Sequence, residues 1–167
     1  MSNKKTLFVI FGITVAVSIF IAVRNSQIDN NANTVKIGYF GPLTGPAAET
    51  SEQMFNAFRL AHTLQPSVGN KDIQVVYEDD GCDPAKAVNA AKKLIEIDKV
   101  DILVSGVCSG STLAVAPIAE KYKKILFTPV SASPKITNAG DYVFRVSGNS
   151  SQMAVAVSKL ISNSLKY

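Results

Sequence analysis

The sequence has few of the side chains that bind metals, with no tryptophan, one histidine (His62) and two cysteines among 167 residues. Two cysteines and one histidine without a C-x-x-C pair do not supply the ligand set of a zinc site, so we expect neither a metal nor a cofactor. Long basic stripes interleaved with aromatic residues are also missing, because the lysines are scattered singly or in pairs. Nucleic acid is therefore not an expected partner.

A single long apolar run stands near the N-terminus. Lys4 and Lys5 precede 17 uncharged, mostly apolar residues, 7–23, and Arg24 closes the run. This pattern is typical of an export signal or a membrane anchor, and its length does not separate the two. We expect residues 1–24 to be a signal peptide or an anchor. The lysines place the rest of the chain on the periplasmic or extracellular face, held in the inner membrane through residues 7–23 if the segment is uncleaved.

A polar linker, 25–33, is predicted to lead into an α/β fold. Apolar stretches with strand-like composition alternate with segments of helical periodicity, which predicts a doubly wound parallel sheet with right-handed crossovers. The predicted strands are 35–40, 73–77, 101–105, 125–128 and 142–146, and the predicted helices are 49–64, 84–97, 112–122 and 150–165.

The two cysteines mark one edge of the predicted sheet. Cys82 and Cys108 each follow a strand and precede a helix, and ligands of open α/β sheets bind where the carboxyl ends of strands meet helix N-termini. Export favours a disulfide, which would close a loop of about 25 residues and stabilise the fold by about 3.5 kcal/mol. The alternative is two buried free thiols.

The segment around Cys108 suggests two kinds of chemistry. Residues 106–110 form a G-x-C-x-G pattern, which in a strand–turn–helix context can expose a nucleophile, but a hydrolase also needs a base and nothing places His62 near Cys108. The same segment suits a carboxylate cradle, because the hydroxyl residues that follow Cys108, with Gly110, precede a helix whose first N–H groups favour an anion. Simple capping by Ser or Thr is the alternative for these hydroxyls.

Several motifs together resemble the leucine/isoleucine/valine-binding protein family, the type I periplasmic solute-binding proteins of ABC importers. The resemblance covers about residues 35–161, and its motifs are 36–38 with 41–46, 79–84 with Ala87, 106–112, 128–134 with Thr137, and Arg145 with 149–152. It implies a type I periplasmic-binding-protein lobe and a Cys82–Cys108 disulfide.

The resemblance also implies a ligand site. Ser109 would hold the ligand α-carboxylate through its hydroxyl and N–H, and the carbonyl of Val130 would receive the ligand ammonium. Ala132 stands where many members have a threonine, and Asn149 and Thr50 replace a common aspartate and an aromatic residue. The residues expected to bind the ligand are Ser109, Gly110, Val130, Ser131, Ala132 and Asn149.

The family is roughly twice this length, with two lobes that close over a solute by hinge motion. We therefore expect a first lobe at 34–148 and an incomplete second lobe at 149–167, in a chain truncated before most of that lobe. The expected function is that of an exported solute-binding protein, not an enzyme, which recognises an amino acid, branched-chain or a similar small zwitterion, for the permease of an ABC importer. A ligand-sensing domain of an anchored receptor is the alternative, and a Cys108-dependent hydrolase is the third hypothesis.

Overall fold

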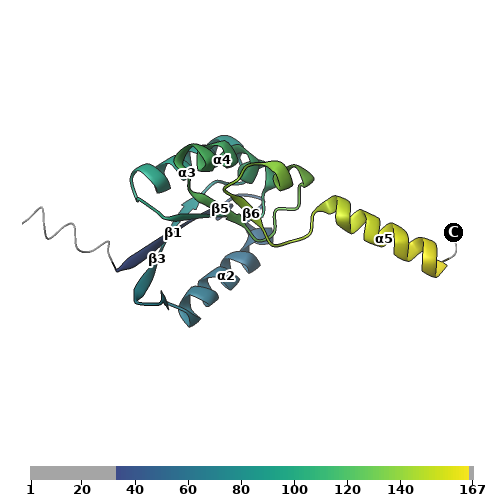
Figure 1. Ribbon diagram of the computed structural model, residues 1–167, viewed down its shortest axis with the longest axis horizontal. Coiled ribbons are helices and arrows are strands. Elements are labelled where there is room, and N and C mark those ends of the chain that lie inside the picture. Colours follow the sequence, from purple (N-terminus) through teal and green to yellow (C-terminus); the bar gives the residue numbers. More distant parts are fainter. Residues whose placement is uncertain (1–32, 166–167) are drawn as a thin grey trace, which may run out of the picture.

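The computed structural model describes residues 33–165, which form a six-stranded sheet with helices on both faces (Figure 1). This confirms the predicted doubly wound α/β fold. In chain order the elements are β1 (Thr34–Gly41), α2 (Ala48–Leu64), β2 (Ser67–Val68), β3 (Lys71–Asp79), α3 (Pro84–Glu96), β4 (Ile102–Ser105), α4 (Ser109–Tyr122), β5 (Ile125–Thr128), the 3-10 helix η2 (Pro134–Asn138), β6 (Val143–Arg145) and α5 (Ser150–Leu165).

The strand order is β2-β3-β1-β4-β5-β6, and every neighbouring pair except β2–β3 is parallel. The sequence did not predict β2, whose two residues pair antiparallel with the start of β3 and are too short to show a periodic pattern. It did not predict η2 either. The five parallel strands and the four long helices lie within three residues of their predicted bounds.

Helices α3 and α4 cover one face of the sheet and enclose the main core. Phe40, Leu103 and Leu126 contribute side chains from three neighbouring strands to this core. The core-facing side of α3 carries alanines and Leu94, and the small alanines allow α3 to pack closely on the sheet and on α4. Burial of these apolar side chains is the main force that holds this layer together.

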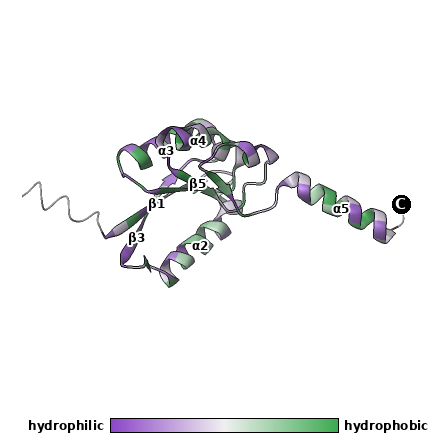
Figure 2. Ribbon diagram, viewed as in Figure 1, coloured by the Kyte–Doolittle hydropathy of each residue, from purple (hydrophilic) through white to green (hydrophobic). Residues whose placement is uncertain are grey.

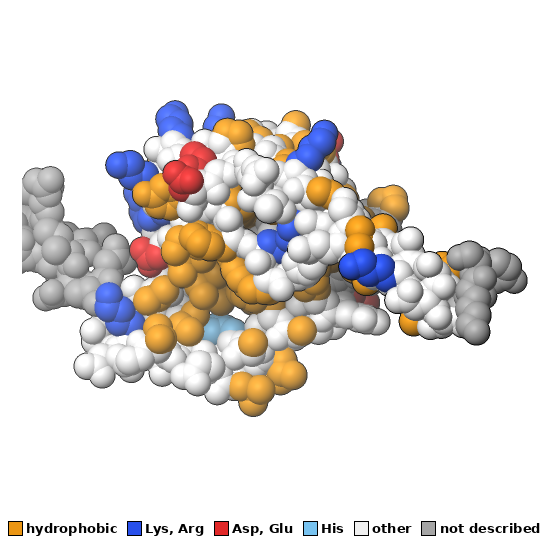
Figure 3. Space-filling model, turned by 45° about the vertical axis from the view of Figure 1, so that its right-hand side comes forward, with side chains coloured by type: hydrophobic (Ala, Val, Ile, Leu, Met, Phe, Trp, Pro, Cys, Tyr) orange, Lys and Arg blue, Asp and Glu red, His pale blue; other side chains and the backbone are white. Residues whose placement is uncertain are grey.

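Helix α2 packs on the opposite face through an aromatic cluster. The ring of Tyr39 in β1 lies 5.6 Å from Phe55, 5.5 Å from Phe58 and 5.9 Å from Tyr77, measured between centroids. Figure 3 shows apolar side chains gathered in the hollow beside α2, around the single histidine, His62.

The β5–β6 side of this face is less covered. The strand register places Val104, Phe127 and Phe144 in one row with Tyr39, yet Phe144 is 50% exposed and Ile125 is 41% exposed. A parallel sheet is normally buried on both faces. Helix α2 therefore covers only part of this one.

Helix α5 projects away from the sheet (Figure 1). Apolar and polar residues alternate around it (Figure 2), and its large apolar side chains are exposed, with Leu160 at 65%. One hydrogen bond, from Ser150 N to Ala132 O at 2.9 Å, ties its first turn to the loop after β5. The boundary between a first lobe at 34–148 and an incomplete second lobe at 149–167 remains a prediction.

Residues 1–24 and most of the linker lie outside the described residues, so the predicted signal or anchor remains untested. Within residues 33–165, no helix combines the length and apolar character that a membrane crossing requires.

Candidate functional site

The carboxyl ends of the central strands bring the predicted site loops together. Cys82 follows β3 and Cys108 follows β4, and a disulfide joins them with a Cα–Cα distance of 5.6 Å. No free cysteine exists among residues 33–165, so the free-thiol alternative is not seen. The disulfide holds the turn before α3 against the start of α4.

The N-terminus of α4 lies open at this edge. The helix begins at Ser109, three residues earlier than predicted, and its N-cap residue, Cys108, provides no side-chain cap. In α3, by contrast, Asp83 Oδ1 accepts a hydrogen bond from Lys86 N at 2.8 Å. Because no Ser or Thr side chain caps α4, its first N–H groups can bind an anionic ligand.

The loop after β5 contacts this helix N-terminus. Ser133 N donates to Ser109 Oγ at 3.2 Å, and Arg145 Nη1 donates to Ser133 O at 2.8 Å. The second terminal nitrogen of Arg145, Nη2, donates to Thr137 Oγ1 at 2.8 Å. Arg145 therefore anchors the loop that faces Ser109.

A buried hydroxyl network lies beneath the rim, the edge of the sheet where the N-terminus of α4 at Ser109 meets the loop after β5. Thr112 Oγ1 is 2.9 Å from both Ser105 Oγ and Ser131 Oγ, and Ser131 Oγ donates to Gly106 O at 3.1 Å. Ser131 N in turn donates to Thr128 Oγ1. Both donors of Ser131 are used inside the protein, so Ser131 supports the rim and has no donor left for a ligand.

The other predicted residues lie close to the same edge. Gly110 is exposed and Val130 is 40% exposed, so both are accessible, while the carbonyl of Ala132 accepts from Ser150 N. Asn149 caps α5, because its Oδ1 accepts from Gln152 N at 2.9 Å and its own N–H donates to Gln152 Oε1 at 3.0 Å.

The sequence did not reveal the role of Asp79 at the end of β3. Its Oδ1 accepts from Leu43 N at 2.9 Å, Thr44 N at 3.3 Å and Gly81 N at 3.0 Å, and its Oδ2 accepts from the Thr44 hydroxyl. Partial burial raises the pKa of Asp79, but these hydrogen bonds outweigh it and hold the pKa below its usual value. Asp79 thereby fixes the loop between β1 and α2.

Its neighbour Asp80 is fully buried, and its Oδ1 accepts from Cys82 N at 2.8 Å. Burial raises the pKa of Asp80 above its usual value and the charges of Asp79 and Asp83 add to this rise, while the hydrogen bond from Cys82 N and the proximity of the Ser111 hydroxyl oppose it. An acidic pair directly after a strand was the available signal for both residues.

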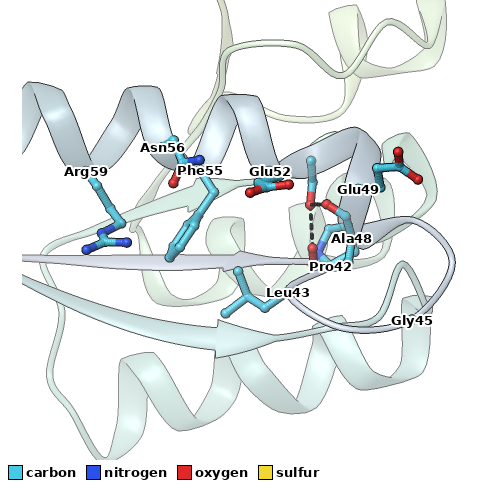
Figure 4. Close-up of a pocket in the computed structure, with 10 residues that line it drawn as sticks. Pro42, Leu43, Gly45, Ala48, Glu49, Glu52, Phe55, Asn56 and Arg59 are labelled. Carbon is cyan, nitrogen blue, oxygen red and sulfur yellow. Dashed lines mark hydrogen bonds between the residues drawn. The ribbon is translucent and has the colours of Figure 1, made fainter.

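A separate groove of about 640 Å³ runs along α2 (Figure 4). In this groove the Arg59 guanidinium lies 5.7 Å from the centroid of the Phe55 ring. Ser51 closes the inner end by donating to Pro42 O and to Ala48 O. None of the predicted ligand residues lines this groove, and Thr50 does not line it either.

The geometry gives no support to the hydrolase hypothesis. Cys108 is bonded to Cys82, and His62 Nε2 lies 2.9 Å from the carbonyl of Ile73, near the opposite end of β3. Residues 33–165 also contain no cluster of three or more His, Cys, Asp or Glu side chains that could hold a metal ion.

Comparison with known proteins identifies similar amino-acid-binding and solute-binding proteins. The chain is 33% identical over 139 residues to the leucine-, isoleucine-, valine-, threonine- and alanine-binding protein of Pseudomonas aeruginosa, covering 81% of this chain and 37% of the relative. A leucine-binding protein structure from Thermotoga maritima matches with a TM-score of 0.74 and 29% identity over 80% of this chain and 38% of its own.

A solute-binding protein of an ABC transporter from Rhodopseudomonas palustris, in complex with 3,4-dihydroxybenzoic acid, matches with a TM-score of 0.75 and 28% identity, covering 79% of this chain and 37% of its own. The chain thus spans less than two fifths of the length of these proteins. Because the profile of the family described as "Periplasmic binding protein" also matches residues 34–165, this chain belongs to the periplasmic binding protein family.

Proposed function

We propose that this chain supplies the first lobe of an exported solute-binding protein that recognises an amino acid, branched-chain or a similar small zwitterion, for the permease of an ABC importer. The observation that carries the proposal is the open N-terminus of α4, which has no side-chain cap and lies at the carboxyl edge of the sheet. An unpaired helix N-terminus with an adjacent hydroxyl is well suited to hold a carboxylate.

In this proposal the ligand carboxylate binds across two loops. It accepts hydrogen bonds from the hydroxyl and N–H of Ser109 and from the N–H groups of Gly110 and Ala132, while the carbonyl of Val130 accepts from the ligand ammonium. Ser131 and Arg145 act indirectly, because they fix the loop that presents Ala132. Asn149 adjoins this loop through the bond between Ser150 and Ala132.

The relatives support a small carboxylate and favour an amino acid. The curated relatives at 33–34% identity are described as binding amino acids. Structural neighbours in complex with 3,4-dihydroxybenzoic acid and 4-hydroxybenzoate carry ligands that share the carboxylate but lack the ammonium. The carboxylate is thus the group that these ligands share, and the test must show whether this chain also requires the ammonium.

The receptor alternative depends on whether residues 7–23 remain in the mature protein. Sequencing the N-terminus of the exported protein separates a released periplasmic carrier from an anchored sensor.

The binding proposal is tested by NMR, with amide shifts of the full chain followed during titration with L-leucine and, separately, with 4-hydroxybenzoate. We expect L-leucine to shift the amides of Ser109, Gly110 and Ala132. Ser109→Ala should weaken binding by about tenfold, because a hydrogen bond to a charged group contributes roughly 1.5 kcal/mol or more.

Ser67→Ala, in β2 at the far end of β3, is the matched control and should bind as the wild type does. Shifts produced by 4-hydroxybenzoate alone would reject the zwitterion in favour of a simple carboxylate. Shifts outside the rim with both compounds, or none with either, would reject the site.

A further inference from the structure

Besides the proposed ligand carboxylate, a carboxyl group of the protein itself lies at the N-terminus of α4. The carboxyl group of Asp80 is fully buried between the turn after β3 and the first turn of α4. Its Oδ2 and the equally buried Oγ of Ser111 make no hydrogen bond within residues 33–165, although Ser111 lies close enough to influence the pKa of Asp80. Neither group has a role in the carboxylate contacts described above.

Asp80 also holds the backbone of the disulfide-bearing turn. Gly81 and Cys82 both have positive φ, at 52° and 65°, and this conformation is unfavourable for a residue with a Cβ. The bond from Cys82 N to Asp80 Oδ1 stabilises this turn, and the disulfide continues from Cys82 to the residue that precedes α4. Asp80 is thus mechanically connected to the rim as well as electrostatically close to it.

A ligand carboxylate at Ser109 would lie one half-turn of α4 away from Ser111. A bound carboxylate and an ionised Asp80 would then be two negative charges at one helix N-terminus, one of them fully buried. The helix dipole attracts both, while nearby like charges each disfavour the ionised form of the other.

We propose that Asp80 is a positioning residue that makes ligand binding proton-linked, so that binding of a carboxylate ligand is accompanied by proton uptake at Asp80 and its affinity rises as the pH falls. This inference rests on the proposed function, because it concerns the same carboxylate site. It adds a regulatory property that the hydrogen-bond geometry of the rim alone does not supply.

Titratable and charged groups from the same turn, from β1 and from α3 surround Asp80. Asp79 and Asp83 lie on the same turn, Tyr39 faces it from β1, and Lys86 of α3 has its Nζ beside Gly81. The pKa of Asp79 is lowered, and burial raises the pKa of Tyr39 to about 12, with a further contribution from Asp80. By contrast, the pKa of Asp80 is raised above its usual value, chiefly by burial.

The sign of the effect follows from linkage. The ligand charge raises the pKa of Asp80 further, so the bound state holds more protons than the free state between the two pKa values. Affinity is then lowest above both values and rises as the pH falls through them. A rise of one pKa unit on binding corresponds to about a tenfold gain in affinity.

The test is calorimetric titration of the full chain with L-leucine from pH 5 to pH 8, in two buffers of different ionisation enthalpy. The wild type should bind more tightly at the low end, by roughly three- to tenfold, and take up protons. Asp80→Asn keeps an oxygen that can accept from Cys82 N, so it should fold, bind with nearly constant affinity and take up no proton.

Asp83→Asn is the matched control, because asparagine still caps α3 while a neighbouring charge is removed, and it should retain the pH dependence. Ser111→Ala removes the hydroxyl that lowers the pKa of Asp80, so the pH window should move upward. Equal leucine affinity at every pH in the wild type, or equal pH dependence in Asp80→Asn, overturns the inference and leaves the proposed function standing. No leucine binding at any pH overturns both.

Discussion

At the scale of single residues, the rim consists of groups that are free to bind and groups that hold them in place. Gly110 and Val130 are accessible, whereas Ser131 and Asp79 use their polar atoms within the protein. Sequence motifs located all four at strand ends but did not separate these roles. The separation depends on partners that lie 25 to 36 residues away along the chain.

Asp79→Asn should loosen the loop between β1 and α2. Because the native pKa of Asp79 is lowered, its carboxylate stabilises the fold above the unfolded-state pKa, and this contribution is lost as the pH falls through the folded-state pKa. We expect Asp79→Asn to lower the free energy of unfolding by about 0.5–1 kcal/mol near pH 7, a small change because the residue is exposed, and to have no effect below the folded-state pKa. Urea denaturation between pH 2.5 and pH 7 measures this.

Asp72→Asn provides the comparison, since Asp72 is an exposed residue near the start of β3, at the other end of the strand from this loop. A similar loss at pH 7 in both variants would show that general charge, not the loop clamp, is responsible.

Gly106→Ala tests the close approach of two backbone segments beneath the rim. A Cβ on Gly106 would lie 2.8 Å from Gly41 Cα and 3.2 Å from Pro42 Cδ, so β1 or β4 must move. We expect a destabilisation of about 1–3 kcal/mol by thermal or urea unfolding.

Gly110→Ala is the contrasting variant, because its Cβ would meet Pro84 Cγ at an ordinary 3.6 Å and alanine suits a helix. Its stability should be unchanged or slightly higher. Equal destabilisation at both positions would contradict the backbone-contact argument.

At the scale of elements, helix ends decide where the site can form. Asp83 caps α3, and Asn149 with Gln152 forms a reciprocal cap on α5, but α4 starts without such a cap. The sequence predicted the helices through their apolar periodicity. It did not predict the start of α4 at Ser109, because the first turn carries the polar residues that are equally typical of a loop.

The disulfide connects two of these helix starts, and its removal should be costly. Cys82 and Cys108 are 26 residues apart, which gives an expected loss of about 3–4 kcal/mol on replacing both with serine, chiefly through the unfolded chain. Urea denaturation of the wild type and the double variant measures the difference.

A reducing agent should lower the stability of the wild type to that of the variant and leave the variant unchanged. A wild type that is equally stable with and without reductant would show that the bond contributes nothing.

At the scale of the whole molecule, parts of the chain differ in how completely other elements bury their apolar side chains. Helices α3 and α4 bury Phe40 and Leu103 completely, while Phe144 and the apolar side chains of α5 stay exposed. Protection against amide exchange should follow this division, since local opening is easiest where few buried contacts must break.

Hydrogen exchange of the chain alone should therefore be fast throughout α5 and slow in α3. The difference should reach several orders of magnitude in rate at Leu160 compared with Leu94, because Leu94 is fully buried and Leu160 is not. Slow exchange in α5 at low protein concentration would contradict this expectation, and slow exchange only at high concentration would indicate association between chains.

By itself the sequence determined the types and order of the five parallel strands and the four long helices, because apolar periodicity and turn residues act locally within stretches such as 37–64 and 84–97. It also placed both cysteines and the polar loops at one edge of the sheet, since the ends of parallel strands must coincide there. Only the tertiary structure decided which polar groups remain free: Ser131 and Asp80 are buried by segments distant in sequence, and burial determines whether a hydroxyl or carboxyl group binds a ligand, supports a loop or changes its pKa.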